Sequence, residues 1–95
     1  MNADIEVIFH FNGDRKLFEG FRPSHLIDGT NLTTGVHHYY KTDDLCSDIT
    51  GTIKFIAPEY YPNCLWIGKK IEMYEGSKNI GYVKVLKIFN SILEK

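Results

Sequence analysis

The sequence has few of the residues that build disulfide-rich or membrane-spanning proteins. It has only two cysteines, Cys46 and Cys64, and three prolines. So sparse a cysteine pair is typical of free thiols in a reducing compartment. No run approaches the roughly 20 apolar residues that cross a bilayer, and the start MNADIE lacks the basic and apolar pattern of a signal peptide. We therefore expect a cytoplasmic protein with no membrane partner.

Motifs for cofactors and catalysis are also missing. There is no G-x-x-x-x-G-K-[ST] loop for a nucleotide. The cysteines and the four histidines lack the short, paired spacings of a zinc site, and His37 and His38 would point to opposite faces of a strand. No local signature surrounds a nucleophile. The sequence predicts neither an enzyme nor a protein with a metal or cofactor.

What is present fits one small globular domain, residues 1–95. Hydrophobic residues make up 43% and charged residues 24% of the chain, which excludes a disordered protein. The aromatic share of 14% favours strands, because flat rings pack well on a pleated surface.

Alternating hydrophobicity predicts the first strand over residues 3–11. Ile5, Val7 and Phe9 share one face, while Asp4 and Glu6 fall on the other. An Asn-Gly turn signal follows directly.

Similar patterns and turn signals predict an all-β fold, either a sandwich or a small barrel. We expect the core to include Ile53, Phe55, Val83 and Val85 along with the first strand. The segment 90–95 could form a short helical tail. The further predicted strands are residues 36–40, 52–57, 69–74 and 80–89, with one bent or two short strands within 16–27, where Gly20 and Pro23 interrupt the pattern.

Three segments, in order, resemble the third domain of elongation factor Tu. Residues 18–23 (FEGFRP) are similar to its F-x-G-[YF]-R-P, and residues 34–36 (TGV) to the T-G-x that follows. Residues 75–85 (EGSKNIGYVKV) resemble its E-G-G-R-T-V-G-x-G-x-V. The resemblance implies a small, closed, six-stranded antiparallel barrel with Greek-key character, in which Gly76 and Gly81 allow tight turning and close approach of the last two strands.

The departures from that family bear on function. The long first loop of the family is shortened here, and Tyr74 stands where the family has an arginine. Lys78 replaces a second arginine, and a lysine offers phosphate only a point charge instead of a forked donor. The family's contact with transfer RNA through this turn is thereby weakened.

The segment 58–67 (PEYYPNCLWI) is the strongest candidate for a protein interface. Two prolines exclude regular strand pairing, yet the segment is rich in large rings. We expect Leu65, Trp66 and Ile67 to plug the end of the barrel, and Tyr60 and Tyr61 to be exposed as an anchor. The acidic residues that would steer a basic partner are Asp43, Asp44 and Asp48.

Charge is distributed unevenly along the chain. Residues 1–67 carry nine acidic against five basic groups, whereas residues 68–95 carry six lysines against three glutamates. A basic final third can mark an anionic partner such as RNA. The candidate phosphate contacts are Lys69, Lys70, Lys78, Lys84 and Lys87.

These observations predict a non-enzymatic binding module whose partner is a protein. One alternative is an immunity protein that neutralises a nuclease-type toxin through the acidic surface. A second alternative is a module that binds transfer RNA or other RNA through the lysines.

Overall fold

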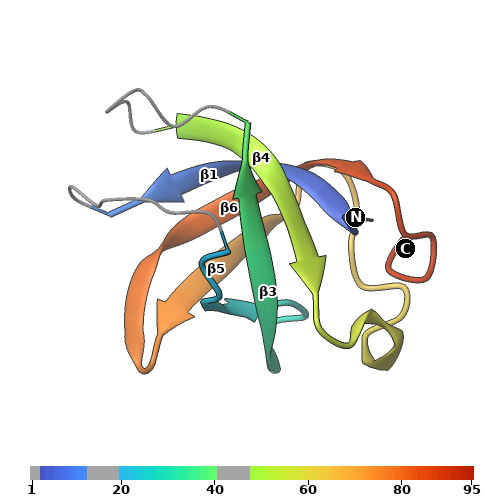
Figure 1. The fold of residues 1–95 in the computed structure, drawn as a ribbon. Helices are drawn as coiled ribbons and strands as arrows, with labels where there is room; N and C mark the ends of the chain where they lie inside the picture. The colour runs from blue at the N-terminus through green and yellow to red at the C-terminus, as the bar shows by residue number, and fades with distance from the viewer. Residues whose placement is uncertain (1–2, 13–19, 41–47) are drawn as a thin grey trace.

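The computed structural model describes residues 3–12, 20–40 and 48–95, and these form a closed antiparallel barrel (Figure 1). Around the barrel the strands follow the order β1-β4-β3-β2-β5-β6. The strands are β1 (Ile5–Phe11), β2 (Ser24–Leu26), β3 (Leu32–Tyr39), β4 (Asp48–Phe55), β5 (Lys70–Glu75) and β6 (Lys78–Ile88). The prediction of an all-β, six-stranded antiparallel barrel is confirmed.

The strand order is that of a Greek key. Strands β2, β3 and β4 are consecutive hairpin neighbours, and β5 returns through the long connection of residues 56–69 to lie beside β2. Every strand therefore has two neighbours, and the barrel has no open edge. No helix long and apolar enough to span a bilayer occurs in the described part of the chain.

The core fills the barrel with the side chains that the alternating pattern selects. All seven residues expected inside are buried: Ile5, Val7, Phe9, Ile53, Phe55, Val83 and Val85. Ile71 and Met73 of β5 join them. The period of two thus identified the buried side chains of β1, β4 and β6 correctly.

Asp4 is a correction to the predicted pattern. The alternation of β1 places Asp4 on the solvent face, but its side chain is buried. Its carboxylate accepts hydrogen bonds from the Phe55 amide (2.7 Å) and the Asn90 side-chain amide (2.9 Å). Because Asp4 precedes the regular strand, it turns inward and ties β1 to β4 and to the segment after β6.

The end of the chain is a second correction. Residues 90–95 make i→i+3 turns, in which the Leu93 amide donates to the Asn90 carbonyl, and a parallel bridge of Leu65 with Glu94. This segment is therefore a docked tail and not a helix. Within residues 16–27, the described part contains one short strand, β2.

Gly81 of β6 lies close to the backbone of β1. Its backbone φ is +141°, and an added Cβ would lie 2.0 Å from the carbonyl oxygen of His10. The close approach is therefore between β6 and β1, and not between β5 and β6 as predicted. A side chain here would force the two strands apart.

The turn between β2 and β3 is organised by one carboxylate. Asp28 accepts hydrogen bonds from the backbone amides of Thr30 and Asn31 and from both of their side chains. The side-chain amide of Asn31, followed by these backbone amides, lowers the pKa of Asp28 well below its usual range. This local network holds β2 in position beside β3.

Candidate functional site

One end of the barrel is built from two segments that lie side by side (Figure 1). The connection of residues 56–69 begins with a 3₁₀ turn, Pro58–Tyr60, because proline suits the first turn and prevents strand pairing. The tail of residues 89–95 docks against it through backbone hydrogen bonds. The Asn63 amide donates to the Ile92 carbonyl (2.8 Å), and the Lys95 amide donates to the Leu65 carbonyl (2.7 Å). We call residues 56–69 and 89–95 the apolar end.

Buried leucines anchor both segments to the core. Leu65 and Leu93 are completely buried and belong to the core cluster. Tyr61 and Cys64 pack against the same cluster. The backbone of the apolar end is therefore fixed, and its outward side chains are presented by a rigid support.

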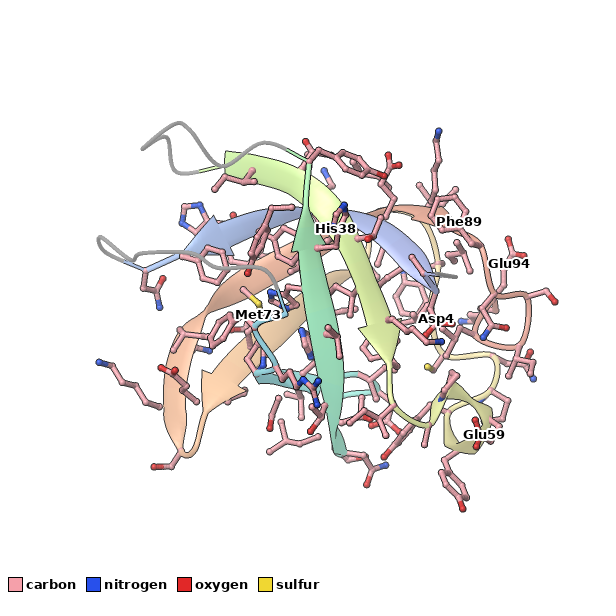
Figure 2. The ribbon with its side chains drawn as sticks, viewed as in Figure 1. Asp4, His38, Glu59, Met73, Phe89 and Glu94 are labelled. Atoms are coloured by element: carbon pink, nitrogen blue, oxygen red, sulfur yellow. The ribbon has the colours of Figure 1, made fainter. Side chains whose placement is uncertain are left out.

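Those outward side chains are unusually apolar. Eight large hydrophobic residues are exposed in the described part of the chain, and six of them lie on the apolar end. Figure 2 labels Phe89 there, with Glu59 and Glu94 at the same end of the barrel. The six exposed side chains are Ile56, Tyr60, Trp66, Ile67, Phe89 and Ile92. Exposed apolar side chains that gather on one region mark interaction sites in monomeric proteins.

An open groove lies where this end meets the first and fourth strands. Its walls include Lys54, Pro58, Phe89 and Ser91, and the paired carboxylate of Asp4 lies in its lining. Lys54 is exposed, and it lines the same groove as Phe89. The groove therefore offers apolar contact next to a positive charge.

Two ammonium groups lie close to the ring of Trp66. The Nζ atoms of Lys69 and Lys95 are 4.7 Å and 5.2 Å from the centre of its ring. Cation–π attraction of this kind restrains a partly exposed ring. Trp66 is 46% exposed and Ile67 is 67% exposed, so of the three residues expected to plug the barrel only Leu65 does so.

The predicted aromatic anchor divides in the same way. Tyr60 is 75% exposed, whereas Tyr61 is partly buried against the core. The 3₁₀ turn explains the difference, because it ends at Tyr60 and the next side chain turns inward. Tyr60 keeps its place in the candidate interface, and Tyr61 supports it from beneath.

The predicted acidic rim is not placed by the structure. Asp43 and Asp44 lie outside the described residues, as does the side chain of Asp48, whose backbone begins β4. Cys46 lies there too, while Cys64 is a free thiol. Cys64 donates to the Tyr61 carbonyl, and burial raises its pKa.

The predicted lysines separate into two groups. Lys69 is half-buried, and its Nζ donates to the carbonyls of Ile27 (2.7 Å) and Cys64 (2.8 Å). It closes the end of the barrel, and this correction removes it from the phosphate contacts. The others are exposed: Lys70 and Lys84 directly opposite each other in β5 and β6, Lys78 in the β5–β6 hairpin and Lys87 opposite Glu6.

The interior contains a polar chain that sequence reasoning missed. The Nε2 atoms of His25 (β2) and His37 (β3) are 2.8 Å apart, and both residues are buried. His25 Nδ1 bonds to the Thr33 carbonyl (3.3 Å), and His37 Nδ1 bonds to the Tyr39 hydroxyl (2.8 Å). The opposite orientation of His37 and His38 is confirmed, since His38 is exposed.

The acceptors fix where the protons lie. A carbonyl only accepts, so His25 carries its proton on Nδ1 and its bare Nε2 accepts from the Nε2–H of His37. His37 Nδ1 is then bare and accepts from the Tyr39 hydroxyl. Burial lowers the pKa of His25 to about 4, and burial and the neighbouring His25 hold that of His37 well below its usual range. Both imidazoles are neutral at pH 7.

These groups form a buried hydrogen-bonded network inside the barrel. The described residues hold no cluster of three or more His, Cys, Asp or Glu side chains that could bind a metal ion. A repeating spacing could not have revealed the histidine pair, since it joins two strands 12 residues apart.

Comparison with known proteins does not identify a family for this chain. No protein-family model matches it, and no curated protein matches it significantly.

Proposed function

We propose that the chain is a non-enzymatic binding module that docks a protein partner on its apolar end. The observation that carries this proposal is that, of the eight large hydrophobic residues exposed among those the structure describes, six lie on residues 56–69 and 89–95. A partner that covered these side chains would remove apolar area from water, which is the main favourable contribution to protein association. Tyr60 and Trp66 supply the rigid rings that dominate binding energies in known interfaces.

The polar groups around this surface suit a partner that places acidic or carbonyl groups at its rim. Lys54 borders the groove, and the Nζ of Lys95 lies 5.2 Å from the centre of the Trp66 ring. Glu59 and Glu94 are also exposed there. Such a rim selects orientation and accelerates association more than it adds affinity.

The resemblance to the third domain of elongation factor Tu supports a binding barrel of that kind. Three glycines of the resembling segments have physical roles in this barrel. Gly76 has a positive φ in the β5–β6 hairpin, and Gly81 lies against β1. At Gly35 a Cβ would lie 2.6 Å from Ile53 Cγ2 and 2.9 Å from the ring of His25, so the glycine makes room for both side chains.

Two tyrosines with different positions test the proposal. The parent protein, immobilised on a resin, is first used to recover a binding partner from a lysate of the source organism, and that partner is purified. Its affinity is then measured for the parent, for Tyr60→Ser and for Tyr40→Ser. Tyr40 is 53% exposed and follows β3, outside the apolar end, so it is the matched control.

We expect Tyr60→Ser to weaken binding at least about 30-fold, as truncation of an interfacial hot spot does, and Tyr40→Ser to leave it unchanged. Equal affinities of parent and Tyr60→Ser, together with unchanged affinity of a Trp66→Ser variant, would place the interface elsewhere.

RNA binding is a second candidate because of one feature of the sheet. Lys70 and Lys84 face each other across β5 and β6, an arrangement of like charges that costs stability. The Nζ of Lys70 also lies 4.2 Å from the ring centre of Tyr82, which stacks on His10 with ring centres 4.9 Å apart. An anionic strand along this face would neutralise both lysines.

A titration of labelled transfer RNA separates this candidate from the first. If RNA is bound, affinity falls steeply with salt because condensed counterions are released. The double variant Lys70→Gln/Lys84→Gln should then reduce that salt dependence. Absence of salt-sensitive binding by the parent at low ionic strength discards the RNA candidate and leaves the protein interface untouched.

A further inference from the structure

The barrel has one narrow seam. Strand β2 is three residues long, and only two of its residues, Ser24 and His25, are in register with β5. By comparison, β6 has 11 residues and pairs with β1 from Ile5 to Phe11. Closure of the barrel therefore depends on a very short β2, and its backbone bonds supply little of the stability there.

His25 compensates for this short strand with its side chain. It lies at the seam, in register with Met73 of β5 and Thr33 of β3. Its imidazole extends over Gly35 and ends at the Nε2 of His37. The hydrogen bond between the two imidazoles thus connects β2 to the interior of the barrel.

Nothing described around the pair would balance a positive charge. From β1, Phe9 and Phe11 face His37, and from β4, Phe55 faces His25. The other groups on the pair are the Phe21 ring, the Thr33 carbonyl and the Tyr39 hydroxyl. The inward side chains of β5 and β6 are apolar: Ile71, Met73, Ile80, Val83 and Val85. The buried carboxylate of Asp4 bonds instead to Phe55 and Asn90.

A further proton disturbs this arrangement. The two Nε2 atoms are 2.8 Å apart, so only one proton fits between them. Protonation of His25 at Nε2 would set two N–H groups against each other, whereas protonation of His37 at Nδ1 requires the Tyr39 hydroxyl to turn and accept instead of donate. Either step leaves a charge in an apolar interior, which is costly unless the strand moves into water.

We propose that the His25–His37 pair is a pH-sensitive latch, which fixes the short strand β2 to β3, and so keeps it beside β5, while both imidazoles are neutral and releases β2 when they take up protons. The low pKa values of both groups agree with this direction. In the unfolded chain a histidine has a pKa of 6.5, so below that pH the open chain binds more protons than the closed barrel and stability falls as the pH falls. Above pH 6.5 the pair contributes its full stabilisation.

The first test measures the unfolding equilibrium by urea at pH 7.5 and pH 5.0. Between pH 7.5 and pH 5.0 the unfolding constant of the parent should rise several hundred-fold beyond the rise that carboxylates cause, because unfolding then takes up two protons. A single buried histidine would contribute about 30-fold. His25→Gln and His37→Gln should each show the smaller rise. His38→Gln, at an exposed neighbouring position, should behave like the parent.

Equal pH responses of the parent and both buried variants would overturn the proposal. If the variants fail to fold, imidazole ¹⁵N shifts of the parent give the decision. We expect a proton on Nδ1 of His25 and on Nε2 of His37, with both rings still neutral in the folded state at pH 5.0. A folded, doubly protonated pair at that pH would equally overturn it.

The second test locates the opening. The amides of Gly35 and His37 donate to the carbonyls of Pro23 and Phe21, so they lose protection when the segment containing β2 leaves. Amide exchange, corrected for the intrinsic pH dependence, should show their protection falling at pH 5.0 at least about tenfold more than that of β1–β6 amides. A uniform loss over all strands would mean global acid unfolding without a latch.

Discussion

Two regions of the molecule reverse the usual distribution of side chains. One is the interior around His25 and His37, and the other is the apolar end. The interior buries polar groups, and every buried polar side-chain atom of the described residues has a hydrogen-bond partner. The apolar end exposes six large hydrophobic side chains on a backbone held by Leu65 and Leu93. Polar groups buried in a barrel must find hydrogen-bond partners there, whereas a proline-broken connection cannot turn all its apolar residues inward.

This contrast separates stability from binding. Substitutions in the interior should change the free energy of unfolding, and substitutions on the outward side of the apolar end should change affinity alone. Neighbouring residues with opposite orientations provide the sharpest comparisons, because they share the same backbone.

The largest effect is expected for Phe55→Ala. Phe55 is 1% exposed and its loss leaves a cavity, so the free energy of unfolding should fall by about 3–5 kcal/mol. The control is Ile56→Ala, one residue further and 64% exposed, which should change it by less than about 0.5 kcal/mol. Urea unfolding followed by circular dichroism measures both. Similar losses for the two variants would contradict the contrast.

Asp4→Ala should follow, with a loss of about 2–3 kcal/mol. The substitution leaves the buried amide of Phe55 without its charged acceptor and frees the side chain of Asn90. Glu6→Ala, two residues along the strand and partly exposed, is the matched control and should cost less than about 1 kcal/mol. Equal stability of Asp4→Ala and the parent would show that water replaces the carboxylate.

Lys69→Met tests whether the half-buried Lys69 contributes to stability more than its exposed neighbour Lys70. The substitution keeps the aliphatic stem but removes the donor to the carbonyls of Ile27 and Cys64, which should cost about 1–2 kcal/mol. Lys70→Met, at an exposed position, should cost less than about 0.5 kcal/mol. Thermal unfolding of both variants under one buffer condition measures the difference. A larger loss for Lys70→Met would reverse the two assignments.

The smallest change in stability is expected for Tyr60→Ala. With 75% of its surface already in water, the side chain gives up little on truncation, so the unfolding curve should shift by less than about 0.5 kcal/mol. Tyr61→Ala, at the partly buried neighbour that packs on the core, should cost more. A destabilised Tyr60→Ala variant would mean that the apolar end helps to hold the barrel together.

Sequence reasoning recovered most of the fold because long strands repeat their pattern. The alternation in β1, β4 and β6 identified the buried side chains, and the turn residues separated the strands. The pattern was wrong for Asp4 because a strand end has no neighbouring residue to enforce alternation. It also assigned the tail of residues 90–95 wrongly, since that segment takes its shape from docking on Leu65.

The candidate site was predicted only in part. The density of rings and prolines pointed to residues 58–67, and Tyr60 is exposed as expected. The orientation of Tyr61, Trp66 and Lys69 depends on contacts with distant parts of the chain, as when Lys69 reaches the carbonyl of Ile27. The histidine pair had no signal, because a buried histidine and an exposed one look alike in an alternating strand.

The position of Asp4 also affects how the chain folds as it is synthesised. The backbone carbonyl of Asp4 accepts the amides of Phe89 and Asn90, and β1 is paired on one side by β6. The backbone hydrogen bonds of β1 are therefore complete only after β6 has been synthesised and has paired with it. A nascent chain that ends before β6 leaves β1 with an open edge, so the ribosome must release almost the whole domain before the barrel can close.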